Sequence, residues 1–349
     1  MNFKELNNEI RSLDTLAMEQ ARNRWNSIAK PLQSLGKLED GIISIAGIQG
    51  THKVVLDKKA LVIMCADNGV VEEGVTQSGQ DITAIVAGNF KKKKATVSIM
   101  CQKSEVDIYP VDIGMTFDAE IIQKKIAKGT KNFTKEPAMS EAQALEAIQV
   151  GMQIVHELKE KDYKIIATGE MGIGNTTTSS AMASIFLNQP VELVTGKGAG
   201  LSDQGLETKI RVIKDAICLH NLNEESNPLE VLVKVGGFDI AGLVGVYLGG
   251  AIYQIPIVID GFISAVAALT AIKLCPNTKD YILPSHVSKE PAGKMMLDSL
   301  NLKPYLTCDM CLGEGTGAVM LFHILETALA VYDGMSTFDD VEIEKYKPL

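Results

Sequence analysis

Residues 164–187 read KIIATGEMGIGNTTTSSAMASIFL, and this stretch decides the fold class. Lys164 to Thr168 are apolar enough for a buried strand, residues 169–178 form a glycine-containing loop, and Ser179 to Leu187 are predicted to be a helix. A strand that leads through a glycine loop into a helix can hold an anion on backbone N–H groups. The loop lacks both the Gly-Lys-Ser/Thr of a Walker A motif and the glycine spacing of dinucleotide-binding folds.

The same strand–loop–helix unit recurs on both sides of this stretch. Ser140 and Gln143 also have the spacing of a capping box at the start of one long helix. We therefore predict an α/β fold with a mostly parallel sheet and helices on both faces. Strands are predicted at residues 60–65, 106–111, 255–259 and 281–283, and helices at residues 81–90, 140–160, 203–220 and 292–300.

Composition and charge narrow the class of protein. The chain has 349 residues, 46% of them hydrophobic, and a formal net charge of −9. This acidic balance argues against nucleic acid as a partner. The longest apolar run, residues 255–272, is interrupted by Pro256, Asp260 and Gly261, so we expect no membrane span. The first residues lack the apolar segment of a signal peptide, and six scattered cysteines fit a reducing compartment, so we expect a cytoplasmic protein.

Cys308 and Cys311 form the one Cys-x-x-Cys pair of the chain. A structural zinc site would need a second pair or histidines at matching spacing nearby, and the sequence has neither. We therefore predict two half-buried thiols and no metal site, and the role of the pair stays open.

Three glycine loops, at residues 169–174, 196–200 and 313–317, predict one extended anionic ligand held by backbone N–H groups. Two of them contain a glutamate, Glu170 and Glu314. The apolar helix predicted after the third loop would point free N–H groups and a positive dipole end at an anion. Because a carboxylate there would repel a phosphate, Glu314 is better suited to act as a base or to stabilise a developing cation.

Several motifs follow one another along the chain: DNGV at 67–70 with EGV at 73–75, GEMGIGNTT at 169–177, GFDI at 237–240, DGF at 260–262, PSHVS at 284–288 and LGEGTGA at 312–318. Together they resemble the nicotinate-nucleotide–dimethylbenzimidazole phosphoribosyltransferase family, in colinear order from about residue 10 to residue 335. The family has a parallel α/β sheet and a small helical domain built from both chain ends. The resemblance therefore implies a small domain of residues 1–50 and 320–349, a large catalytic domain of residues 51–319, and a homodimer.

The resemblance implies transfer of 5-phosphoribosyl from nicotinate mononucleotide to 5,6-dimethylbenzimidazole or a related lower-ligand base in cobamide biosynthesis. The products are nicotinate and a nucleotide of the α-ribazole 5′-phosphate type. No cofactor or metal is expected, because nicotinate leaves from a pyridinium. By resemblance Glu314 is the catalytic base and Glu170 lies beside the ribose. The resemblance places the nucleotide on Gly172, Gly174, Asn175, Thr176, Gly198 and Lys209, the base on Thr76 and Gln80, and the sugar near Asp260 and Ser288, with Gly313 and Gly315 flanking the base catalyst.

Other functions stay open at this point. The loop at residues 75–80, VTQSGQ, is more polar than in better-known family members, so adenine or a phenolic base could be the preferred acceptor. A sugar-phosphate lyase or kinase could use the same glycine loops, and a requirement for Mg²⁺ or ATP would identify it. A non-catalytic nucleotide-binding regulator would bind nucleotide without turning it over. The strand order, the preferred base and the dimer surface are not predicted.

Overall fold

A six-stranded parallel sheet organises the computed structural model, which describes residues 1–346. The strand order is β3-β2-β1-β4-β5-β6, and every neighbouring pair is parallel. This confirms the predicted fold class and adds the strand order of doubly wound nucleotide-binding sheets. The strands are β1 (Lys59–Ala66), β2 (Val106–Gly114), β3 (Ile122–Gln123), β4 (Ile165–Met171), β5 (Ile257–Ile259) and β6 (Ile282–Pro284).

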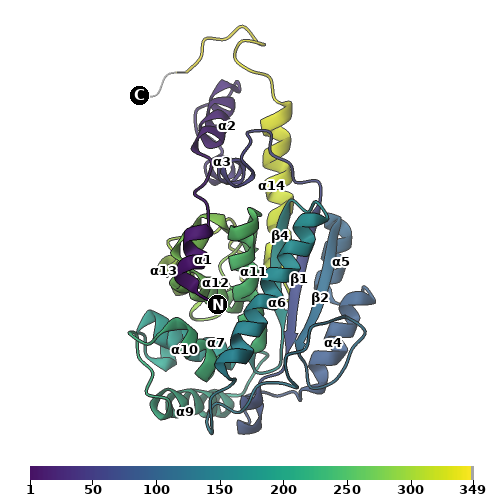
Figure 1. The fold of residues 1–349 in the computed structure, drawn as a ribbon. Helices are drawn as coiled ribbons and strands as arrows, with labels where there is room; N and C mark the ends of the chain where they lie inside the picture. The colour runs from purple at the N-terminus through teal and green to yellow at the C-terminus, as the bar shows by residue number, and fades with distance from the viewer. Residues whose placement is uncertain (347–349) are drawn as a thin grey trace.

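Helices cover both faces of the sheet (Figure 1). Side chains along a strand alternate between faces, so β1 supplies two separate cores. Ala60, Val62 and Met64 pack with helices α6, α11 and α12, whereas Leu61 and Ile63 pack with α4, α5 and α14. These helices are α4 (Asp81–Lys91), α5 (Thr96–Ser104), α6 (Glu141–Glu160), α11 (Phe238–Tyr253), α12 (Phe262–Leu274) and α14 (Thr316–Gly334).

Glycines in α6 and α11 let these two helices pack in close contact. A Cβ on Gly245 would overlap the Ile148 carbonyl oxygen, and one on Gly151 would overlap the carbonyl oxygen of Gly242. Side chains at these positions would therefore push the helices apart. Glycine costs helix propensity, and here the cost is offset by close approach of the two backbones.

The ends of the chain meet beyond one end of the sheet. Helix α14 extends from the sheet to α2 (Thr15–Ser27) and α3 (Lys37–Gln49), as Figure 1 shows. Phe338, beyond α14, is buried, and Thr337 forms an antiparallel bridge with Ile28. Helix α1 (Phe3–Glu9) instead contacts the large part of the chain, where the Asn277 backbone N–H donates to Asn7 Oδ1 at 2.9 Å. The division of the chain into two domains stays a prediction.

Some element boundaries differ from the sequence prediction. Helix α7 (Asn175–Leu187) begins four residues before Ser179, and α9 (Asp203–Leu219) is capped by Ser202. The capping box of Ser140 and Gln143 is confirmed. Among the described helices, none is long and apolar enough to cross a bilayer. The remaining elements are η1 (Gly69–Glu73), α8 (Val191–Val194), α10 (Pro228–Val235), η2 (Pro276–Tyr281) and α13 (Gly293–Ser299).

Candidate active site

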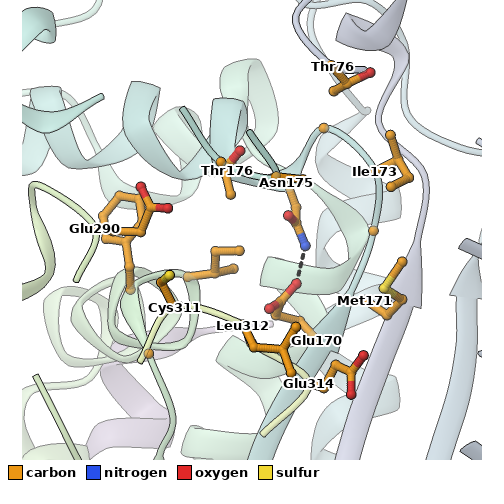
Figure 2. A pocket seen from close by; sticks show the side chains of 18 of the residues that line it. Thr76, Glu170, Met171, Ile173, Asn175, Thr176, Glu290, Cys311, Leu312 and Glu314 are labelled. Atoms are coloured by element: carbon orange, nitrogen blue, oxygen red, sulfur yellow. Dashed lines mark hydrogen bonds between the residues drawn. The ribbon is translucent and has the colours of Figure 1, made fainter. Parts of the chain in front are cut away.

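A cavity of about 350 Å³ lies at the carboxyl ends of the strands. The order of the sheet reverses direction between β1 and β4, which is the position where doubly wound sheets bind ligands. The loops that follow these and neighbouring strands line the cavity together (Figure 2). They are residues 75–78, 170–176, 197–199, 260–264 and 311–314.

Glu314 lines this cavity from a strained turn. Gly313, Glu314 and Gly315 have φ values of 86°, 62° and 94°, and such a value is unfavourable for a residue with a side chain. Glu314 Oε2 accepts a hydrogen bond from the Val97 backbone N–H in the first turn of α5, at 3.3 Å. Burial raises the pKa of Glu314, and the charge of Asp260 adds to this effect. A carboxylate whose pKa is raised is suited to accept a proton near neutral pH.

Glu170 lines the same cavity from β4. Its carboxylate accepts a hydrogen bond from the side-chain amide of Asn175, drawn as a dashed line in Figure 2. The residue is 7% exposed, and burial raises the pKa of its carboxyl group well above the ordinary value, with Asp239 and Asp260 adding to the shift. The fold therefore brings the two glutamates that the sequence singled out into one cavity.

The N-terminus of α7 faces the cavity and is open in that no side chain caps it, although the Asn175 backbone N–H donates to the Gly172 carbonyl at 3.2 Å. Its N-cap residue, Gly174, has φ 96° and supplies no side-chain cap, and Gly174, Asn175 and Thr176 all line the cavity. Gly198 lines the cavity beside them, and its φ of 53° suits glycine. A Cβ on Gly198 would lie 2.9 Å from Thr176 Oγ1, so these two segments are in contact. Together they form a candidate anion-binding site of backbone N–H groups.

Lys209 lies directly behind this anion-binding site. Its ammonium donates to Thr176 Oγ1 at 2.8 Å and to the Gly196 carbonyl at 3.1 Å. Burial lowers the pKa of Lys209 to about 8, and the carboxyl group of Glu290 opposes the shift. Lys209 does not line the cavity itself, so it orients Thr176 and adds positive potential behind the helix end.

The carboxylate of Asp260 binds the N-terminus of α14, where a ligand anion was predicted to bind. Its carboxylate oxygens accept hydrogen bonds from the backbone N–H groups of Gly315 (3.1 Å), Gly317 (2.7 Å) and Ala318 (3.1 Å). The expectation that α14 points free N–H groups at a ligand anion is therefore wrong, because Asp260 is the anion that these groups bind. Burial nonetheless raises the pKa of Asp260 to about 7, against the effect of these donors.

Gln80, Lys209 and Gly315 do not line the cavity, whereas the other predicted site residues do. The Gln80 amide donates to the Asn68 carbonyl at 3.2 Å, and its oxygen accepts from Thr116 Oγ1 at 3.3 Å. Gly315 is buried against Leu61. Their assignment to substrate binding stays a prediction. The predicted residues that line the cavity are Thr76, Glu170, Gly172, Gly174, Asn175, Thr176, Gly198, Asp260, Ser288, Gly313 and Glu314.

Apolar side chains line part of the cavity and were not predicted from the sequence. Ile82 and Val86 are one helical turn apart on α4, so they present a common face. That spacing was the available signal, but it is the same in any amphipathic helix. The apolar residues of the lining include Val75, Ile82, Val86, Met171, Ile173 and Leu312.

Cys308 and Cys311 are both exposed, contrary to the half-buried prediction, and Cys311 lines the cavity.

An anion-binding helix end and two carboxylates at the switch point of a parallel sheet fit a phosphoribosyltransferase, and a family model described as "Phosphoribosyltransferase" matches residues 10–343. Nicotinate-nucleotide–dimethylbenzimidazole phosphoribosyltransferases from Ruminiclostridium cellulolyticum and Acetivibrio thermocellus are each 48% identical to the chain. These alignments cover 100% and 95% of both sequences, respectively. The crystal structure of CobT from Thermus thermophilus superposes with a TM-score of 0.89 at 33% identity, over 95% of this chain and 100% of that one. The chain belongs to the nicotinate-nucleotide–dimethylbenzimidazole phosphoribosyltransferase family.

Proposed function

We propose that this protein transfers the 5-phosphoribosyl group of nicotinate mononucleotide to 5,6-dimethylbenzimidazole in cobamide biosynthesis. The products are nicotinate and a nucleotide of the α-ribazole 5′-phosphate type. The names of the relatives support this reaction. The observation that carries the proposal is that Glu170, Glu314 and the open N-terminus of α7 line a single cavity.

The 5′-phosphate binds at the N-terminus of α7 in this proposal. The backbone N–H groups there and the helix dipole favour a dianion, and Gly198 allows the neighbouring loop to approach it. The buried ammonium of Lys209 fixes the Thr176 hydroxyl and adds a positive charge behind the phosphate. The first turn of α7 contains no acidic residue, so the anion meets no repulsion from the helix itself.

Glu314 acts as the base. The lone pair of one acceptor ring nitrogen forms the bond to the ribose C1′ carbon, and the bond from C1′ to the nicotinate nitrogen breaks with its electron pair going to nicotinate. The proton of the other ring N–H passes to the Glu314 carboxylate. Its partial burial and raised pKa support this role, which typically contributes about 10²–10⁴-fold in rate.

Glu170 stabilises the positive charge that develops on the ribosyl carbon. A fixed carboxylate in a site that excludes water stabilises a developing cation far more strongly than a carboxylate in bulk solvent does. Asn175 holds this carboxylate in one orientation through its amide hydrogen bond. The role requires Glu170 to be ionised when the ribosyl group is bound.

The lining of the cavity supports an apolar acceptor base. Ile82, Val86 and Met171 would contact the methylated ring. The polar groups of the 75–80 loop are engaged elsewhere: Thr76 Oγ1 donates to the Ser78 carbonyl at 2.9 Å, and the Gln77 amide donates to the Gly200 carbonyl. These bonds fix the two donors within the loop, so the apolar contacts with the ring are what support dimethylbenzimidazole as the preferred acceptor.

A competition assay tests the function and the acceptor together. Purified protein is incubated with nicotinate mononucleotide and an equimolar mixture of dimethylbenzimidazole, adenine and phenol, and the products are identified by mass spectrometry. We expect the dimethylbenzimidazole nucleotide to dominate and the Glu314→Gln variant to form almost none. Preferential use of adenine or phenol would overturn the acceptor assignment. Nucleotide binding without any transfer would instead indicate a regulator.

We also propose that the protein is a cytoplasmic homodimer. The family resemblance supports the dimer, as do the exposed apolar side chains of Ile85 on α4 and Ile99 on α5. All six cysteines are unpaired, which supports a reducing compartment. Light scattering coupled to size-exclusion chromatography should give twice the chain mass of 37.7 kDa, and a monomer mass would overturn the assembly.

A further inference from the structure

A buried carboxyl group that does not line the cavity lies directly under it. Asp239 is the second residue of α11 and is fully buried. Its Oδ1 accepts a hydrogen bond from the Ile240 backbone N–H at 2.9 Å. Its Oδ2 has no hydrogen-bond partner among residues 1–346. A Cβ atom added to Gly172 would lie 3.0 Å from this oxygen, so Asp239 is a close neighbour of Gly172. Asp239 therefore sits beneath the loop that carries the chain from Glu170 to α7.

Asn175 holds Glu170 and influences Asp239. Its amide donates to the Glu170 carboxylate, and its side chain lowers the pKa of the Asp239 carboxyl group. Among the charges that raise the pKa of Glu170, that of Asp239 is foremost, ahead of Asp260 and Glu314. The pKa of Asp239 is itself raised to about 7, mainly by burial.

Positive charge is scarce around these two carboxyl groups. Within the described residues, neither Glu170 nor Asp239 takes part in an ion pair, and the same holds for Asp260 and Glu314. Two neighbouring buried carboxylates without a cation resist being ionised together. The titratable groups around them come from several elements: Cys65 on β1, Asp67 just after β1, Asp112 on β2, Asp260 after β5 and Glu314 before α14. Two lysines lie in the same region, but each has another carboxyl partner. Lys125 pairs with Asp112, and Lys209 on α9 interacts with Glu290.

We propose that Asp239 is a positioning residue for the transfer reaction, which sets the charge state in which Glu170 meets the ribosyl group. This inference rests on the proposed function, because Glu170 must be ionised only if it stabilises the ribosyl cation of that reaction. A negative Asp239 keeps the proton on Glu170, and the Asn175 amide favours its release. The balance between these two neighbours decides the pH at which the enzyme becomes active.

Substitutions of Asp239 and Asn175 should shift the pKa of Glu170 in opposite directions. Asp239→Asn keeps the shape and the acceptor for the Ile240 N–H but removes a negative charge, so Glu170 should ionise at lower pH. Two unit charges about 4 Å apart at an effective dielectric constant of about 20 correspond to a shift of roughly three pH units, and the shift falls in proportion as the separation grows. Asn175→Ala removes a donor to the carboxylate, so the same ionisation should move to higher pH.

The experiment measures kcat/KM for nicotinate mononucleotide as a function of pH, because this ratio reports ionisations of the free enzyme. The ionisation that disappears in Glu170→Gln is assigned to Glu170. We expect it at lower pH in Asp239→Asn and at higher pH in Asn175→Ala. The control is Glu290→Gln: this carboxyl group lines the same cavity but is not among the charges on Glu170, so the ionisation should stay in place.

Three outcomes separate the possibilities. If the wild-type protein transfers nothing, the proposed function fails and Asp239 is not the reason. If the wild type is active and Asp239→Asn leaves the ionisation of Glu170 unmoved, the role of Asp239 is refuted. If Asp239→Asn gives no cooperative melting transition, Asp239→Ser decides, because it also removes the charge and keeps an oxygen acceptor: a shift of the Glu170 ionisation to lower pH supports the coupling, and an unchanged profile refutes it.

Discussion

Replacing Gly169 by alanine should displace the turn that carries Glu314 without changing any side chain that takes part in the proposed reaction. A Cβ on Gly169 would lie 2.5 Å from the Glu314 carbonyl oxygen, 2.7 Å from its carbonyl carbon and 2.9 Å from the Gly315 nitrogen. All three are backbone atoms, so no flexible side chain can move aside. Ordinary contact begins at 3.4 Å, so the turn must move by about 0.9 Å from its present 2.5 Å.

A displacement of this size is large for a catalytic group. A shift of about 1 Å in a reacting group can cost on the order of 10²-fold in rate. We therefore expect Gly169→Ala to lower kcat about 10²-fold, and the strain of overpacking to cost about 1–3 kcal/mol of stability. Asp260 holds the turn through the Gly315 N–H, so the strain cannot be relieved by a free movement of the loop.

The assay is the initial rate of nicotinate release at saturating substrates, together with the melting temperature. Gly88→Ala is the matched control, because a Cβ there meets no atom within 4 Å. It should keep the wild-type rate and gain up to about 1 kcal/mol from better helix propensity in α4. A Gly169→Ala enzyme with the kcat of the wild type would refute the reasoning, since it would show that the position of the turn does not govern the rate.

Three further predictions concern single groups of the cavity. Glu314→Gln should lower kcat by about 10²–10⁴-fold with little change in melting temperature; a small rate effect would assign the base elsewhere. Since burial lowers the pKa of Lys209 to about 8, its ammonium loses its proton above that pH. The KM for nicotinate mononucleotide should then rise in initial-rate measurements above pH 8, and this rise should be absent in Lys209→Met. Val86→Asn should raise the KM for dimethylbenzimidazole by about tenfold or more while the nucleotide KM stays constant; equal effects on both would contradict the apolar acceptor site.

The sheet could be predicted from the sequence because its strands leave a local pattern. The apolar run from Ala60 to Cys65 is too short for a helix and is buried on both faces, as strands of a parallel sheet are. The strand order leaves no such pattern, because it depends on how similar apolar surfaces pack over long distances. Ile122 and Gln123 form a two-residue strand, which is too short to be recognised by periodicity.

The cavity shows the same division between local and long-range information. Glycines at positions 174 and 198 were predicted to form loops around a ligand, and both have positive φ values and line the cavity. The direction of a polar side chain was not predictable in the same way. Gln80 turns away from the cavity because Asn68 and Thr116, which come from other segments, satisfy its amide.

The two carboxylate-bearing glycine loops, which the sequence presents as similar, have different tasks in the fold. The N–H groups of α14 are bound by Asp260, so that helix end stabilises a protein carboxylate and fixes the turn of Glu314. The end of α7 has no side-chain cap and has Lys209 behind it. In the proposed function we therefore expect the phosphate at the N-terminus of α7 and the developing cation beside Glu170, which Asn175, the first residue of α7, holds through its amide. The fixed turn of Glu314 then presents the base from the other helix, because Asp260 has already neutralised the N–H groups at the start of α14.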